Sequence, residues 1–191
     1  MQHALEMGEW DIITLQQVSG LSGKYESYVP HLDRLIAIVS KAQPQAELVW
    51  HMTWSYAKES THGDFPKYDR DQQKMYDAIT DCVHRMLKEY DCFEKIIPSG
   101  TAIQSLRLSE INNSPKDFTR DGYHMDLGAG RYALACTWYE TLIKPYTHLS
   151  MMGNSLRLDL GDVKVTDTTA PYCQKAAKKA ARKPFKVQRI K

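Results

Sequence analysis

Hydrophobic residues in this chain follow two alternating patterns, one typical of buried strands and the other of amphipathic helices. Apolar runs at 11–17, 46–54 and 93–98 predict three strands. Between and after these runs, apolar residues recur at helical spacing. Strands that alternate with helices form a parallel sheet that helices cover on both faces. The pattern therefore predicts an α/β fold.

Capping and breaking residues set the bounds of the predicted helices. The first helix is expected to have Ser27 as its cap and Pro30 in its first turn, and to end before Pro44. A long second helix carries an apolar stripe from Met75 to Leu87. Three more helices are expected at about 100–109, at 128–142 and from 170 onward.

Three parallel strands are few for 191 residues, a length that can bury roughly 70% of its unfolded surface in one domain. The first strand, 11–17, shows no alternation of apolar and polar positions. We therefore expect it to need neighbouring strands at both of its edges. At least one of these neighbours is missing from the pattern.

Charge is unevenly distributed along the chain. Residues 174–191 hold eight Lys and Arg and no acid, so residues 1–173 carry 17 basic and 23 acidic side chains. We expect one acidic domain at 1–173 and a basic helix or tail at 174–191. Such a tail can contact nucleic acid or a membrane surface, but a solvated terminal helix is the favoured interpretation. Neither partner is expected.

Other sequence signals are negative. No stretch reaches the ~20 apolar residues of a membrane span, and the first residues show no signal peptide. The four cysteines lack the paired spacing of a zinc site, and three lie in apolar surroundings typical of a core, although disulfides stay open. No metal, nucleotide or other cofactor is expected.

The stretch RDGYHMDLGAGRY, residues 120–132, contains the pattern Asp-x-x-His. In a turn, the carboxylate of Asp121 can reach Nδ1 of His124, which fixes the tautomer and leaves Nε2 free to accept a proton. The alternative is a polar loop in which both side chains only cap backbone groups. So short a pattern favours the loop when it is taken alone.

The flanks of this pattern change that balance. The segments LQQVSGLSG, LVWHMTWSYA, IPSGTAIQSLR and RDGYHMDLGAGRYALACTWYETL, in this order, resemble sequence blocks of the SGNH (GDSL-like) hydrolase superfamily. They look most like a bacterial branch described as a domain of unknown function, and the resemblance spans roughly residues 9–143. It implies a serine esterase with Asp121 and His124 as the acid and base of its triad. It also implies a flavodoxin-like three-layer α/β/α fold, whose parallel sheet here lacks its first two strands.

By the same resemblance, a glutamine at the end of the first strand donates to the oxyanion, where the superfamily at large uses Asn. Gln17 is the first candidate and Gln16 the second. One such donor is typically worth about 3 kcal/mol. The alternative role for Gln17 is an amide that orders the loop.

Residues 51–56, HMTWSY, end the second strand at the edge where open α/β sheets bind ligands. We expect His51, Trp54 and Tyr56 to line a substrate cleft, with Tyr123 close to them. Trp and Tyr offer flat surfaces that stack on sugar rings. Core packing is the alternative, and we favour it for at least one of these residues.

The nucleophile is not evident. The superfamily places its serine after the first strand, in a Gly-Asp-Ser or Gly-Asn-Ser turn. The chain has no Gly-Asp-Ser, and its Gly-Asn-Ser at 153–155 follows the Asp-x-x-His block, so Ser155 is an unfavourable candidate. We expect that the serine-bearing strand precedes the first residue. A partner chain that supplies the strand, or self-association through an open sheet edge, is the alternative.

The leading hypothesis is therefore an SGNH-type hydrolase of carbohydrate or acyl esters, present as a C-terminal portion that lacks its nucleophilic serine and is inactive as given. The alternative is a non-catalytic carbohydrate-binding protein of the same fold. Nucleic-acid binding through the basic tail comes third, because the body is acidic. The substrate, the compartment and the oligomeric state stay open.

Overall fold

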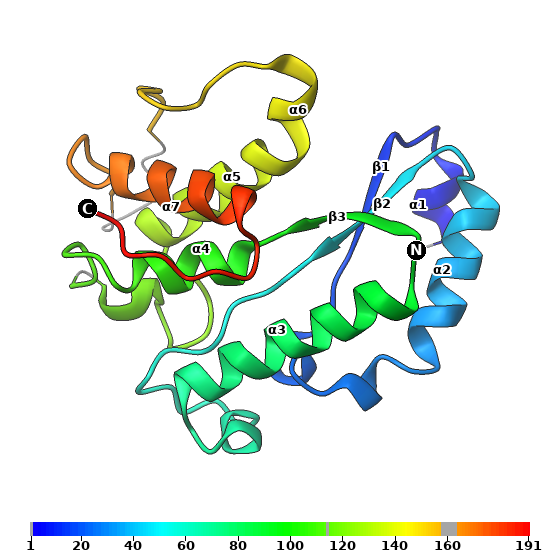
Figure 1. Cartoon of the computed structure of the whole chain (residues 1–191), viewed down its shortest axis with the longest axis horizontal. Coiled ribbons are helices and arrows are strands. Elements are labelled where there is room, and N and C mark those ends of the chain that lie inside the picture. Colours follow the sequence, from blue (N-terminus) through cyan, green and yellow to red (C-terminus); the bar gives the residue numbers. More distant parts are fainter. Residues whose placement is uncertain (1, 114, 158–163) are drawn as a thin grey trace.

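In the part of the chain that the structure describes, the fold is built on a parallel sheet of three strands in the order β1–β2–β3 (Figure 1). The computed structural model describes residues 2–113, 115–157 and 164–191. The strands are β1 (Ile12–Leu15), β2 (Glu47–His51) and β3 (Phe93–Ile97). Helix α2 (His31–Ala42) connects β1 to β2, and α3 (Gln72–Glu89) connects β2 to β3. The predicted α/β class and its three parallel strands are confirmed.

Further helices complete the described chain. They are α1 (Gln2–Glu6), α4 (Ser99–Leu106), α5 (Ala129–Trp138), α6 (Lys144–Thr147) and α7 (Ala170–Arg182). Helix α5 runs through one π-helical turn, Tyr139–Ile143, into α6. Four 3-10 helices lie at Ser19–Leu21, Tyr25–Ser27, Phe65–Tyr68 and Lys116–Phe118. The three later helices predicted from the sequence correspond to α4, to α5 with its π turn, and to α7.

Successive side chains of the central strand pack on opposite faces of the sheet, as the twofold period of a strand requires. Leu48 and Trp50 belong to the core formed with α2 and α3. Val49 packs on the other face with Leu142 and Trp138, from the end of α5 and its π turn. Each large apolar side chain buried in this way stabilises the fold by about 1.5–3 kcal/mol. Helical segments therefore cover both faces.

Strand β1 forms one edge of the sheet, and its cover is incomplete. Its side chains from Ile12 to Thr14 are half-buried, whereas β2 is buried from Leu48 to His51. Within the described residues, β1 pairs with β2 alone. The sequence expectation of an apolar strand with a free edge therefore matches the structure.

The start of α2 differs from the prediction, because Ser27 does not cap it. Ser27 ends a 3-10 helix, and its hydroxyl donates to the Lys24 carbonyl oxygen at 2.6 Å. Helix α2 begins only at His31, after Pro30, with no side-chain cap. The local turn uses the hydroxyl that a helix cap would have needed.

Helices α4, α5 and α7 pack together beside the sheet (Figure 1). Small side chains make this close approach possible, since Ala133, Ala176 and Ala177 are fully buried. Cys173 and Gln174 of α7 are buried as well. The expected boundary after residue 173 therefore falls inside a helix with one packed face, and its basic residues lie on the remaining surface.

Helix α5 begins at a buried carboxylate. Asp126, 1% exposed, accepts hydrogen bonds from the backbone N–H of Gly128 at 2.7 Å and of Gly130 at 2.8 Å. Burial raises the pKa of Asp126, although these two hydrogen bonds oppose the shift. A Cβ on Gly130 would lie 2.7 Å from the Phe118 carbonyl oxygen, so only glycine fits there. The Gly-Ala-Gly step is therefore the capped entry to α5.

Replacing this cap should destabilise the protein more than replacing an exposed one. We expect Asp126→Ala to lower the free energy of unfolding by about 2–3 kcal/mol, because two buried N–H groups lose their acceptor. Asp126→Asn keeps one acceptor and should cost roughly half as much. Urea unfolding measures both values. The control is Asp71→Ala at the exposed start of α3, where Asp71 accepts from Lys74 N at 2.8 Å and a cap is worth about 1 kcal/mol. Equal losses for Asp126→Ala and Asp71→Ala would contradict the expectation.

Candidate functional site

The Asp-x-x-His pattern forms a closed turn. His124 Nδ1 lies 2.7 Å from Asp121 Oδ2. The other carboxylate oxygen accepts from the backbone N–H of His124 at 2.7 Å and of Tyr123 at 3.1 Å. The His124 side chain is 54% exposed. The pairing of carboxylate and imidazole expected from the sequence is therefore present, and no hydrogen bond within the described residues engages Nε2 of the ring.

Backbone contacts hold this turn in place. Gly122 has a φ of +90°, a conformation that L side chains rarely adopt. Its carbonyl oxygen accepts from Ala57 N at 2.8 Å, and a Cβ there would lie 3.1 Å from Ser60. Across the turn, Arg120 N donates to the His124 carbonyl oxygen at 3.0 Å. The turn is thus fixed against the segment that follows β2.

The electrostatics of the pair suit proton transfer. Burial raises the pKa of Asp121, but hydrogen bonds from the His124 ring and from the backbone N–H groups of His124 and Tyr123 outweigh it and lower the pKa. The carboxylate therefore stays ionised at neutral pH and favours the tautomer with a proton on Nδ1. A ring in that state can accept a proton at Nε2.

Aromatic rings surround the turn on one side. The Tyr123 ring lies 4.3 Å from the His124 ring, 4.7 Å from His62 and 6.0 Å from Tyr56, measured between centroids. Tyr56 is fully buried, and its hydroxyl lies 3.1 Å from Ser19 Oγ. The expectation that Tyr56 stacks on a ligand therefore needs correction, because no face of its ring reaches solvent.

Trp54 links the end of β2 to the turn. Its indole Nε1 donates to the Tyr123 carbonyl oxygen at 2.8 Å, and its side chain is half-buried. Among the aromatic residues expected to bind substrate, Trp54 and Tyr123 keep accessible surface. They lie beside the Asp121–His124 pair.

A second polar group joins the carboxyl ends of all three strands. His51, the last residue of β2, is 7% exposed. Its Nδ1 lies 2.6 Å from Gln16 Oε1, and its Nε2 lies 2.9 Å from Ser99 Oγ. His51 was expected to line the cleft, but both ring nitrogens are engaged inside the protein. Sequence reasoning missed Ser99; its place just after β3 was the signal that could have found it.

The two glutamines have different surroundings. Gln17 Nε2 donates to the carbonyl oxygen and the hydroxyl of Ser27, at 3.1 and 3.0 Å, and Gln17 Oε1 accepts from Val18 N. Gln17 therefore orders its own loop, which was the alternative role. Gln16 is exposed, and the hydrogen bonds of the described chain engage only its Oε1. The amide nitrogen of Gln17 therefore has partners, whereas no hydrogen bond within the described residues engages that of Gln16.

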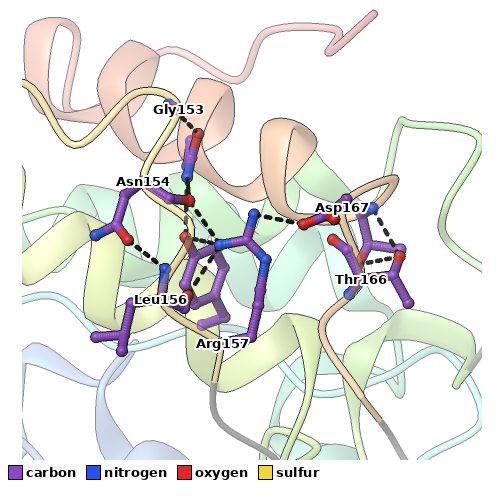
Figure 2. Close-up of polar contacts among 9 residues, drawn as sticks. Gly153, Asn154, Leu156, Arg157, Thr166 and Asp167 are labelled. Carbon is purple, nitrogen blue, oxygen red and sulfur yellow. Dashed lines mark hydrogen bonds and ion pairs between the residues drawn. The ribbon is translucent and has the colours of Figure 1, made fainter.

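Ser155 is exposed. Figure 2 shows the polar contacts of its neighbours Gly153, Asn154, Leu156 and Arg157. Asn154 Oδ1 accepts from Leu156 N at 2.6 Å, and Gly153 has a φ of +79°. Arg157 closes the segment by donating to the Asn154 carbonyl oxygen at 2.6 Å. Within the described chain, no histidine is hydrogen-bonded to Ser155. Gly-Asn-Ser here is a turn former.

A buried arginine connects two segments that lie next to the turn. Arg107, 7% exposed, donates to Ser55, to Gln104 and to the Asp117 carbonyl oxygen. Burial lowers its pKa to about 10, while the Asp117 carboxylate acts in the opposite direction. These bonds tie the segment after β2 to the loop before the turn. Beside the turn lies a hollow of about 250 Å³, lined in part by Asp121 and Gly122.

Neither a metal site nor a membrane-spanning helix is evident in the described residues. In 2–113, 115–157 and 164–191, no group of three or more His, Cys, Asp or Glu side chains is placed to hold a metal ion. In the same ranges, no helix combines the length and the apolar character needed to cross a membrane. All four cysteines are free, and Cys82, Cys136 and Cys173 are buried.

His51 should make stability sensitive to acid. Burial lowers its pKa to about 4, against ~6.5 in an unfolded chain. Between these values the unfolded chain binds a proton that the folded chain does not, so stability falls as pH decreases through this window, by up to about 3 kcal/mol. We expect His51→Gln to flatten this part of the profile. Urea unfolding between pH 7 and 4 measures it, with the exposed His148→Gln as control. Parallel profiles for wild type and His51→Gln would contradict the assignment.

Comparison with known proteins places the chain in a family. A family model described as "Domain of unknown function (DUF4886)" matches residues 1–179. A DUF4886 family protein from Bacteroides uniformis, whose crystal structure is known, is 37% identical in sequence to this chain. The two structures superpose with a TM-score of 0.86. That match covers 100% of this chain and 70% of the other. No curated protein matches the chain. The family model spans most of the sequence, and the chain therefore belongs to the DUF4886 family.

Proposed function

We propose that this chain carries the acid–base half of a serine ester hydrolase of the SGNH type. The observation that supports it best is the Asp121–His124 pair, whose Nδ1 is held by a carboxylate 2.7 Å away while the ring is 54% exposed. A histidine that only capped a helix would not need this arrangement. Asp126, not Asp121, caps α5.

In the proposed reaction, a serine hydroxyl attacks the ester carbonyl carbon while Nε2 of His124 takes its proton. The tetrahedral intermediate then collapses, the bond to the leaving alkoxide breaks, and His124 returns the proton to that oxygen. A water molecule releases the acyl group by the same two steps. Asp121 orients the ring and stabilises its protonated form throughout.

The negative charge on the carbonyl oxygen needs donors. Gln16 supports the proposal better than Gln17, because the amide of Gln17 is bonded to Ser27 and Val18. Gln16 follows β1 at the carboxyl edge of the sheet, where open α/β sheets bind their ligands. One oxyanion donor is worth about 10²–10³ in kcat.

We propose that the nucleophilic serine lies outside the 191 residues. No serine in the described part of the chain is hydrogen-bonded to His124. A parallel strand added to the free edge of β1 would bring its carboxyl end beside Gln16, as the flavodoxin-like layering of the SGNH superfamily requires. The solved relative is longer, since the match covers 70% of it.

The second candidate is a carbohydrate-binding protein without catalysis. The half-buried Trp54 and Tyr123 favour it, because accessible aromatic faces stack on sugars. The hydrogen-bonded pair of Asp121 and His124 has no role in that function, so the hydrolase is the stronger proposal. Labelling by a fluorophosphonate probe separates the two.

Removing the base should abolish hydrolysis. We expect His124→Ala to lower kcat on short p-nitrophenyl esters by at least about 10³-fold, and Asp121→Asn by a similar or smaller factor, because the tautomer is lost. The assay uses the chain together with any residues encoded directly upstream. His148→Ala, which changes an exposed histidine away from the turn, should leave kcat unchanged. Equal turnover by wild type and His124→Ala would overturn the proposed function.

A further inference from the structure

Three polar side chains from three different strand ends form one continuous hydrogen-bonded group. Gln16 follows β1 directly, His51 ends β2, and Ser99 lies two residues beyond β3. The distances are 2.6 Å from Gln16 Oε1 to His51 Nδ1 and 2.9 Å from His51 Nε2 to Ser99 Oγ. Ser99 is fully buried and Gln16 is exposed. The group therefore runs from the interior to the surface at the carboxyl edge of the sheet.

The chemistry of the partners fixes the direction of these bonds. An amide oxygen can only accept, so His51 Nδ1 must carry the proton that faces Gln16 Oε1. The other ring nitrogen then has a free lone pair, which accepts from the Ser99 hydroxyl. The ring lies against Trp138 and Trp54, with centroids 5.2 and 6.4 Å away. This apolar contact and its burial keep the ring neutral.

Apolar side chains could fill these strand ends without any hydrogen bonds. The reason for a polar group here lies at its exposed end, in the amide of Gln16. With Oε1 of Gln16 held by His51, the position of Nε2 in the same amide is set, and no hydrogen bond in the described residues engages that nitrogen. A donor that is held before substrate arrives needs no rearrangement during the reaction.

We propose that His51 and Ser99 are positioning residues, which hold the Gln16 amide so that its nitrogen is presented as an oxyanion donor. The inference rests on the proposed function, because it assigns Gln16 to that reaction. Ser99 holds the His51 ring by donating to Nε2, and the ring in turn holds the Gln16 amide in one orientation. Neither residue touches substrate.

The orientation can be measured on the 191-residue chain without any activity. ¹⁵N spectra of the imidazole at pH 7 should show His51 protonated at Nδ1 and unprotonated at Nε2. Relaxation of the Gln16 side-chain ¹⁵NH₂ group should show a rigid amide in the wild type and a mobile one in Ser99→Ala. A ring protonated at Nε2, or a Gln16 amide equally mobile in both proteins, would overturn the proposal.

Two replacements of His51 separate positioning from general stability. Asn places an amide N–H close to the site of Nδ1 and keeps the bond to Gln16, whereas Gln reaches the site of Nε2 and keeps only the bond to Ser99. We expect a rigid Gln16 amide in His51→Asn and a mobile one in His51→Gln. If both variants free the Gln16 amide to the same extent, the role of His51 is only structural and the proposal fails.

Ester hydrolysis then tests the link to catalysis, with the chain extended by any residues encoded upstream. His51→Gln should lower kcat at least about tenfold at unchanged KM, because an oxyanion donor acts only in the transition state. His51→Asn should stay within about threefold of the wild type. A wild type that hydrolyses no ester, with the spectra as expected, would refute the proposed function and leave the positioning of Gln16 standing. Equal kcat in both variants with unequal Gln16 mobility would refute the catalytic role assigned to that positioning.

Discussion

Polar groups that the fold removes from water near the ends of its strands must find partners inside the protein, and this constraint determines the architecture of the candidate site. Asp126 accepts hydrogen bonds from the N–H groups of Gly128 and Gly130 at the start of α5. Arg107 donates to Ser55, to Gln104 and to the Asp117 carbonyl oxygen. Both ring nitrogens of His51 have partners. The bonds of Arg107 to Ser55 and of His51 to Gln16 and Ser99 connect segments far apart in the sequence. The turn of Asp121 and His124 is held by Ala57 N and Trp54 Nε1, which donate to the carbonyl oxygens of Gly122 and Tyr123.

The fold could be predicted from the sequence where local periodicity determines structure. The three strands and the helices α3, α4 and α7 have clear apolar patterns, and burial decides their type. The start of α2 could not be predicted, because a 3-10 turn competes with the helix for the hydroxyl of Ser27. The π turn at Tyr139–Ile143 has no local signal either. It satisfies packing against the sheet, which only the tertiary structure specifies.

The candidate site, too, could be predicted from the sequence only where contacts between neighbouring residues determine its geometry. The pairing of Asp121 with His124 spans three residues, so its geometry follows from the turn itself. The environments of His51 and Gln17 depend on partners at other positions, Ser99 for the first and Ser27 for the second. The type of a residue at the end of a strand shows that it is near the functional edge. It does not show whether the side chain faces the ligand or the interior.

The π turn has a consequence for how this helical segment is used. An α-helix presents one stripe along its length, but an extra residue within a turn shifts the stripe around the axis. Ala133, in the middle of α5, packs in the α4–α5–α7 core, whereas Trp138 at its end and Leu142 within the π turn pack on the sheet. One continuous helical segment, α5 with its π turn, thus contributes side chains to two separate cores. A one-residue deletion in 139–143 would restore regular winding and misalign one core against the other, so insertions and deletions should be tolerated less here than substitutions.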